Sequence, residues 1–300
     1  MKIKTSITRK IFVVFNYLLI TLLCFMFVLP VLNVLAKSLN DGVDASRGGI
    51  WFWPRVFTWD NYKMVLSGGT FKDSIFITVS RVLISVVFGI IVQFATAYAL
   101  AKKRFPGKGL IVIFFMLPMF FNAGVMPTYV WFSKINLLNN FWVYIFPFAF
   151  SFYNVVIIRT FIQSTIPKSL EESAFIDGAT EVTVFFRIIM PLCKPILATI
   201  ALWIMVFHWN DWTTTLMYIK KPKLYTMQYI MMELVKESER LQKLMAESAK
   251  MGMTMENAAS PTSDTVISAQ IMVTILPIIC VYPFLQKYFV KGIMMGSVKG

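Results

Sequence analysis

Residues 11–36 read IFVVFNYLLITLLCFMFVLPVLNVLA and carry no charged side chain. A helix that crosses the hydrocarbon core of a bilayer needs about 20 predominantly apolar residues, and this stretch is longer than that. It is also too long for a simple signal peptide, and it lacks a cleavage site of small residues. The stretch therefore predicts a membrane-spanning helix near the start of the chain.

The composition of the whole chain indicates the same class of protein. Of its 300 residues, 57% are hydrophobic and only 15% are charged, and the mean hydropathy is +0.68. An average soluble domain is about 45–50% apolar and about 25% charged. The three cysteines are far apart and show neither a disulfide framework nor metal-ligand spacing; they are Cys24, Cys193 and Cys280. We therefore predict a polytopic membrane protein.

Five further stretches are long and apolar enough to span a bilayer, and they cover about residues 74–101, 110–132, 141–162, 196–217 and 266–289. The second span contains Arg81 and Gln93, which we expect to face protein rather than lipid. Arg81 is expected to be a structural charge that is paired within the bundle. The sequence thus predicts an all-α protein with six transmembrane helices, consisting of a tail over residues 1–10 and one transmembrane domain over residues 11–300.

The positions of the charges indicate a topology. A formal net charge of +14 suggests a nucleic-acid partner in a soluble protein. Here, however, lysine and arginine without acidic residues gather in the tail, in the connection near residues 102–108 and after the sixth span. With six spans these segments lie on one side, and short basic loops mark the cytoplasmic side. Both termini are therefore predicted to be cytoplasmic, and no nucleic-acid partner is expected.

Two long loops are predicted on the opposite side. Residues 37–73 contain Trp51, Trp53, Trp59 and Tyr62, which favour an aromatic belt at the membrane interface. Residues 220–264 contain an amphipathic stretch in which apolar residues recur at helical spacing. That predicted helix either covers the outer mouth of the bundle or docks an external partner, and the sequence leaves both interpretations open.

The connection over residues 166–191 differs from the other predicted cytoplasmic segments, because it is neither short nor purely basic. Pro167 and the acidic residues after it favour the start of a helix, and Gly178 can end that helix. A second helix follows and is expected to stop before Pro191. The first helix carries apolar side chains that are expected to face the cytosol and to meet a protein partner, namely Ala174, Phe175 and Ile176.

This connection resembles a known family motif. The chain reads Glu172-Ser173-Ala174, three residues, Gly178, nine residues, then Ile188-Ile189-Met190-Pro191. This resembles the EAA loop of bacterial ABC importer permeases, which reads Glu-Ala-Ala, three residues, Gly, nine residues, Ile-x-Leu-Pro. Every spacing matches, and only Ser173 and Met190 depart from the pattern. The alternative interpretation is a surface helix pair that only closes a loop.

The resemblance extends over most of the chain. Residues 52–62, 209–212 and 286–300 resemble segments of sugar-importer permeases, most closely the second permease subunit of maltose-type carbohydrate importers. Residues 158–163 resemble the branch that often serves complex or polysaccharide-derived oligosaccharides. The implied fold is a type I ABC importer permease with a cytoplasmic EAA coupling helix-turn-helix, in a bacterial inner (plasma) membrane.

The resemblance also implies a function and partners. The chain is expected to form half of the translocation pathway for a carbohydrate of the oligosaccharide class, in a heterodimer with a second permease subunit. Two ATPase subunits and an extracytoplasmic solute-binding protein are the other expected partners, with the lipid bilayer around the spans. The residues that the resemblance assigns to ATPase coupling are Glu171, Glu172, Ser173, Ala174, Phe175, Ile176, Asp177, Gly178, Ile188 and Pro191.

Polar and aromatic residues inside spans are candidates for the substrate pathway, because sugars offer hydroxyl groups to polar side chains and C–H faces to aromatic rings. The densest run is His208, Trp209, Asn210, Asp211 and Trp212, and the weaker candidates are Asn122, Tyr129 and Asn154. The run equally fits an outer gate or a contact with the partner permease, and a lone asparagine is often an interhelical contact. The partner permease is also a candidate for holding most of the sugar.

Several catalytic signatures are missing from the sequence. It contains no Gly-x4-Gly-Lys-Ser/Thr phosphate loop and no Gly-x-Ser-x-Gly elbow, and His208 is its one histidine. We therefore expect no enzyme activity, no metal and no cofactor in this chain, with ATP and Mg bound by a partner ATPase. The alternatives are a permease for peptides or polyamines, or a membrane scaffold for an ATPase that transports nothing. The residues do not indicate which sugar is carried.

Overall fold

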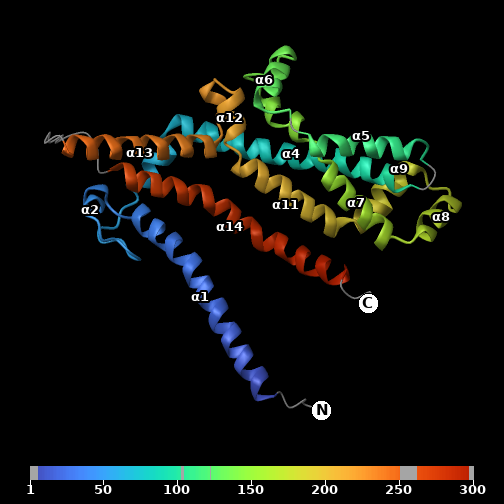
Figure 1. Ribbon diagram of the computed structural model, residues 1–300, viewed down its shortest axis with the longest axis horizontal. Coiled ribbons are helices and arrows are strands. Elements are labelled where there is room, and N and C mark those ends of the chain that lie inside the picture. Colours follow the sequence, from blue (N-terminus) through green and yellow to red (C-terminus); the bar gives the residue numbers. More distant parts are fainter. Residues whose placement is uncertain (1–5, 103–104, 122, 251–261, 297–300) are drawn as a thin grey trace. The chain divides into compact units, whose positions relative to one another are not determined.

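The computed structural model describes residues 6–102, 105–121, 123–250 and 262–296, and it consists of helices and their connections (Figure 1). Over these residues the only β-pairing is an isolated antiparallel bridge between Asn40 and Phe57. The all-α prediction is therefore confirmed. The chain divides into two compact units, Met1–Gly69 with Met231–Leu276, and Thr70–Ile230 with Pro277–Gly300.

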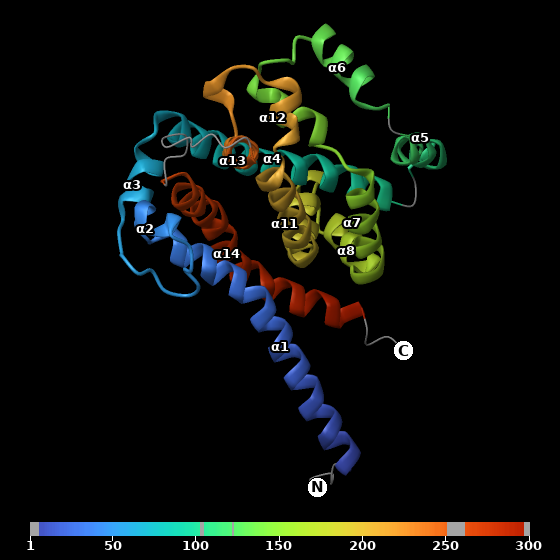
Figure 2. The ribbon, with the colours of Figure 1, turned by 60° about the vertical axis from the view of Figure 1, so that its left-hand side comes forward.

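The first unit is built on a long apolar helix. Its elements are α1 (Ile7–Ser38), α2 (Gly42–Ser46), α3 (Asp60–Ser67), most of α13 (Met227–Lys250) and the first part of α14 (Thr262–Gly296). The apolar side chains of α1 are exposed over most of its length, as expected for a helix in lipid or against another membrane chain. Both views place the carboxyl-terminal half of α1 beside the start of α14 (Figures 1 and 2).

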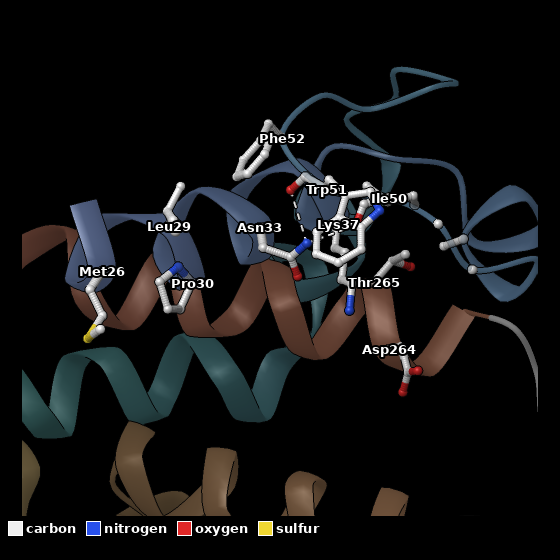
Figure 3. Close-up of a pocket in the computed structure, with 13 residues that line it drawn as sticks. Met26, Leu29, Pro30, Asn33, Lys37, Ile50, Trp51, Phe52, Asp264 and Thr265 are labelled. Atoms are coloured by element: carbon white, nitrogen blue, oxygen red, sulfur yellow. Dashed lines mark hydrogen bonds between the residues drawn. The ribbon is translucent and has the colours of Figure 1, made fainter. Parts of the chain in front are cut away.

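Asparagine side chains hold the loop that follows α1. Asn61 Nδ2 donates to Ser38 O and to Asn40 O, at 3.0 and 2.8 Å. Thr265 Oγ1 of α14 donates to Asn61 Oδ1 at 2.9 Å. Asn33 Nδ2 donates to the carbonyl oxygens at residues 50 and 51, at 2.8 and 3.0 Å, beside a cavity of about 830 Å³ (Figure 3). These amides satisfy backbone groups that a turn leaves without helical partners.

The second unit contains the remaining helices. They are α4 (Gly69–Ala101), α5 (Lys108–Phe120), α6 (Val125–Lys134), η1 (Phe141–Tyr144), η2 (Phe146–Phe148), α7 (Phe152–Thr165), α8 (Lys168–Ile176), α9 (Glu181–Thr183), η3 (Val184–Ile189), α10 (Met190–Leu192), α11 (Lys194–Asn210), α12 (Thr213–Tyr218) and η4 (Pro222–Leu224). Their core contains fully buried side chains of α4, α7, η3 and α11, including Phe94, Val155, Ile189 and Ile200. Figures 1 and 2 place α8 and α12 at opposite ends of this unit.

The predicted spans are only partly continuous helices. Among the described residues, α1 and α4 are each long and apolar enough to cross a membrane, and up to five spans result if three bent helix pairs each count as one. The described apolar part of α14 is the shorter segment Asp264–Cys280. The apolar helices agree with a membrane protein, and the number of six crossings stays a prediction.

Three stretches that were predicted as single spans are each broken, and the stretch 196–217 is one of them, because α11 ends at Asn210 and α12 begins at Thr213. The stretch 110–132 forms α5 and α6, and Gly124 between them has a φ of +83°. The stretch 141–162 forms η1 and η2 followed by α7, with a bend of 49°. Pro147 lies in η2, and Ser151 has extended backbone angles before α7 begins. Apolar composition hides such breaks, because both sides of the break are equally hydrophobic.

Candidate functional site

Residues at its two ends set the limits of helix α8. Pro167 immediately precedes its first residue, and Glu171 lies in its first turn, where the helix dipole favours a negative charge. After Ile176 the chain reverses at Gly178, whose φ is +81° and whose N–H donates to Phe175 O at 3.1 Å. No atom lies within 4 Å of the position that a Cβ of Gly178 occupies, so the dihedral angle rather than space requires glycine.

The two faces of α8 differ in exposure. Ala174 is only 9% exposed and belongs to the core cluster that includes Ile162 and Ile166, so the prediction that Ala174 faces the cytosol is wrong. A small side chain at this position lets the helix lie close against the bundle. The exposure predicted for the other two apolar residues is confirmed: Ile176 is 86% exposed and Phe175 is 38% exposed. Their polar neighbours Glu172, Ser173 and Asp177 are exposed as well.

A lysine at the end of α4 holds this loop. Lys102 Nζ lies 2.7 Å from Glu171 Oε2 and 3.4 Å from Glu181 Oε2. Tyr98 donates its hydroxyl to Glu181 Oε2 at 3.1 Å, and the Lys102 ammonium lies 4.4 Å from the centre of the Tyr98 ring. We call these four residues the Lys102 clamp. It ties α4 to both α8 and α9.

The ammonium of Lys102 is charged near neutral pH. Partial burial disfavours the ammonium, but the hydrogen bond with Glu171, the contact with Tyr98 and the negative charge of Glu171 outweigh it and raise the pKa of Lys102. Glu171 is thus engaged inside the chain, although the resemblance assigned it to a partner. Sequence reasoning missed Lys102 and Tyr98 as parts of this site. Lysine after an apolar span was counted only as a topology signal.

The second helix of the loop does not stop before Pro191, as was predicted, but runs through it to Leu192. Residues Val184–Ile189 form a π-helix, in which the N–H of Met190 donates to Phe185 O. Pro191 lies in the first positions of α10, where a missing N–H costs least. Because the preceding π-helix makes a wider turn and Pro191 lies at the start of α10, this proline does not break the helix. Ile188 is half-buried against the core cluster, and Pro191 is exposed.

A buried ionic network lies at the other end of the unit. Arg81 is completely buried, and its guanidinium pairs with the Asp211 carboxylate, as the prediction of a paired structural charge requires. Arg81 Nη1 also donates to Asp211 O at 3.0 Å, and its Nε donates to His208 Nδ1 at 3.2 Å. The guanidinium carbon lies 4.5 Å from the centre of the Tyr144 ring. Asp211 and one face of His208 therefore serve the fold.

The predicted pathway residues do not share one environment in the structure. Helix α11 ends at Asn210, whose side chain is exposed and donates to Val206 O at 2.9 Å. Trp209 is buried and Trp212 is half-buried. Of the weaker candidates, Tyr129 stacks on Tyr218 with ring centroids 6.3 Å apart. Asn122 lies outside the described residues.

One cavity brings together two of the predicted pathway residues. His208 and Asn154 both line a space of about 310 Å³ beside α4, α7 and α11. The same wall includes Gln93 and Trp203, which the sequence did not single out as pathway residues. In the part of the chain that the structure describes, no group of three histidine, cysteine or acidic residues is arranged to hold a metal ion.

Comparison with known proteins places the whole chain among transport components. Residues 85–295 match the family described as "Binding-protein-dependent transport system inner membrane component". Protein LplC of Bacillus subtilis (strain 168) is 36% identical over 91% of this chain and 90% of its own. The polygalacturonan/rhamnogalacturonan transport system permease protein YtcP of the same organism is 31% identical over 94% of this chain and 95% of its own.

A solved structure agrees with these sequence matches. It is described as a bacterial ABC transporter involved in the import of the acidic polysaccharide alginate. The matched chain is 26% identical to this one and superposes with a TM-score of 0.83, covering 95% of this chain and 99% of its own. The likeness thus extends over nearly the whole length of both chains.

Proposed function

This chain belongs to the family of binding-protein-dependent transport system inner membrane components, and we propose that it forms half of the translocation pathway of a bacterial ABC importer for oligosaccharides. It is a carbohydrate-importer permease in a membrane, and several of its relatives carry names of that kind. Those relatives are named for the transport of polygalacturonan/rhamnogalacturonan, arabinooligosaccharides and melibiose, raffinose or stachyose. A second permease subunit completes the pathway, and a solute-binding protein delivers the sugar from outside.

The single observation that supports the coupling role is the outer face of α8. Phe175 and Ile176 expose apolar surface beside the exposed carboxylates of Glu172 and Asp177. An apolar patch with an acidic rim fits a cleft in an ATPase subunit that has an apolar floor and basic edges. In this proposal two ATPase subunits bind ATP and Mg, and this chain binds no cofactor.

The Lys102 clamp gives this docking a mechanical consequence. When the ATPase subunits close on ATP, α8 moves with them, and the clamp moves α4 with α8. Nucleotide binding then shifts the population between inward-facing and outward-facing states of the permease pair. The topology that follows has α8 and both termini in the cytoplasm and six crossings, with α12 near the outer surface.

A reconstituted complex tests this function. The chain is co-expressed with the permease, ATPase and binding protein encoded beside it, and the complex is placed in liposomes. We expect ATP hydrolysis to rise several-fold with binding protein and one of a panel of pectin-derived, arabinan-derived or raffinose-type oligosaccharides, with uptake of the same sugar. Stimulation by a peptide or a polyamine and by no sugar overturns the carbohydrate assignment, and an assembled complex that transports nothing supports the scaffold alternative.

Gly178 offers a second test, because its left-handed backbone is essential to the turn after α8. Gly178→Pro fixes φ near −65° and removes the N–H that donates to Phe175, so we expect uptake to fall at least about tenfold. Gly178→Asn is the matched control, since asparagine tolerates left-handed angles better than other residues with a side chain. It is expected to retain most of the uptake. Equal uptake by both variants contradicts a role for this turn.

A further inference from the structure

A cavity of about 310 Å³ lies inside the second unit, where the broken span of η2 and α7 meets α4 and α11. Its wall combines polar and aromatic groups: Gln93, Ser151, Asn154, Trp203, Phe207 and His208. Ligand pockets have volumes of about 300–1,000 Å³ and mostly apolar walls with a few polar groups. This cavity is at the lower end of that range, which corresponds to one sugar ring rather than a chain of them.

The broken span itself points to a ligand. Irregular backbone at membrane depth is stable only where it is covered by protein or lines a cavity, and broken helices form the binding sites of many transporters. Here η2 ends at Phe148 and α7 begins at Phe152. Gln93 Nε2 donates to Ala149 O at 2.9 Å, which satisfies one carbonyl that the break leaves open. A Cβ on Gly89 lies only 3.3 Å from that nitrogen, so glycine makes room for this contact.

Two polar side chains of the wall, His208 and Gln93, each have a hydrogen-bonding group without a partner among the described residues. The Arg81 guanidinium can only donate, so His208 Nδ1 is the acceptor of their 3.2 Å contact. The hydrogen of the neutral imidazole is then on Nε2, which gives the His208 side chain one donor for the cavity that it lines. Gln93 Oε1 is buried and has no hydrogen-bond partner in the structure. Of these two groups, the His208 N–H donor suits a sugar hydroxyl, whose oxygen accepts.

The aromatic side of the cavity opens outward from the chain. Trp203 and Phe207 are both exposed, and the Trp203 ring stacks on Tyr153 with centroids 6.2 Å apart. A wall that also holds a glutamine, an asparagine and a histidine is costly against lipid, so this opening faces protein or a water-filled pathway. A fixed indole ring beside polar groups suits the apolar face of a pyranose.

We propose that this cavity binds one sugar residue of the transported carbohydrate during translocation. Trp203 stacks on the C–H face of the ring, and Asn154 and His208 Nε2 hydrogen-bond its hydroxyls. Gln93 is a positioning residue that keeps the break in η2 and α7 open. The inference rests on the proposed oligosaccharide import, and it assigns a substrate contact to this subunit in addition to any in the partner permease.

Uptake by substituted complexes tests the site. Trp203→Leu and Asn154→Leu each remove one contact, and we expect initial uptake of the transported oligosaccharide to fall about tenfold, with complex assembly judged by co-purification. Trp203→Phe keeps an aromatic face and is expected to recover much of the loss. The matched controls are Val206→Ala and Val156→Ala, which change exposed residues of α11 and α7 outside the cavity and are expected to transport normally.

A second measurement uses the unaltered complex and so does not depend on how the variants fold. An oligosaccharide with a diazirine on one ring is photolysed during turnover, and the labelled peptides are identified by mass spectrometry. The proposal predicts label in residues 147–154 or 203–208 of this chain. Label confined to the partner permease or to lipid overturns it, as does normal uptake by both leucine variants. If the wild-type complex transports no sugar at all, the importer function itself fails.

Discussion

Ile176→Asp is expected to abolish sugar uptake and to detach the ATPase subunits, while the chain still folds in the membrane. Ile176 is 86% exposed at the end of α8, so its replacement disturbs no internal packing. At the proposed interface the change removes about 1.5–3 kcal/mol of apolar burial. It also buries an unpaired carboxylate, which adds a penalty of several kcal/mol. At 1.4 kcal/mol per factor of ten, the affinity for the ATPase falls at least a hundredfold, by an order-of-magnitude estimate.

Co-purification of the ATPase and initial uptake measure this effect. Ile176→Leu keeps the apolar surface and is expected to behave as wild type. Ile135→Asp is the control for the substitution itself, because Ile135 is also exposed but follows α6 instead of lying on α8. Unchanged co-purification and uptake in Ile176→Asp exclude docking through this face of α8, and a loss in Ile135→Asp as well shows that the effect is not specific.

The coupling loop shows which features a sequence predicts and which it does not. The limits of α8 follow from Pro167 and Gly178, because a fixed φ and a left-handed φ act on the backbone locally. The burial of Ala174 could not be predicted, since a helix of two or three turns has apolar residues on more than one face. The pair of Lys102 and Glu171 joins residues 69 apart in the chain, and only the fold brings them together.

In the spans, too, some features could be predicted from the sequence and others could not. Hydropathy predicted the apolar stretches, and α1 and α4 are helices of the expected length. It could not predict the breaks after α5, η2 and α11, because an apolar run looks the same whether it is straight or bent. Gly124 and Pro147 were the available signals, yet both residues are also common in unbroken transmembrane helices. The cavity beside Asn154 depends on one of these breaks and was therefore missed.

Arg81→Met and Asp211→Leu are each expected to destabilise the permease strongly. The Arg81 side chain is 0% exposed and that of Asp211 is 7% exposed. Removing one partner of a buried ion pair leaves the other charge without compensation, which typically costs 3–5 kcal/mol, to order of magnitude. Asp211 also accepts hydrogen bonds from Thr213 and Thr214 where α11 ends and α12 begins. We therefore expect a lower midpoint of thermal unfolding for the purified complex, and earlier proteolysis near this corner.

The double variant Arg81→Met/Asp211→Leu separates the charge pair from its surroundings. With both charges gone, no buried charge is left alone, so the loss of stability is expected to be smaller than the sum of the two single losses by at least about 1 kcal/mol. Full recovery is not expected, because His208 Nδ1 loses the Arg81 donor and the corner at Asp211 loses its threonine contacts. Strict additivity of the single effects contradicts a direct interaction of Arg81 with Asp211. A recovered stability without recovered uptake indicates instead that the pair also sets the orientation of His208 toward the cavity.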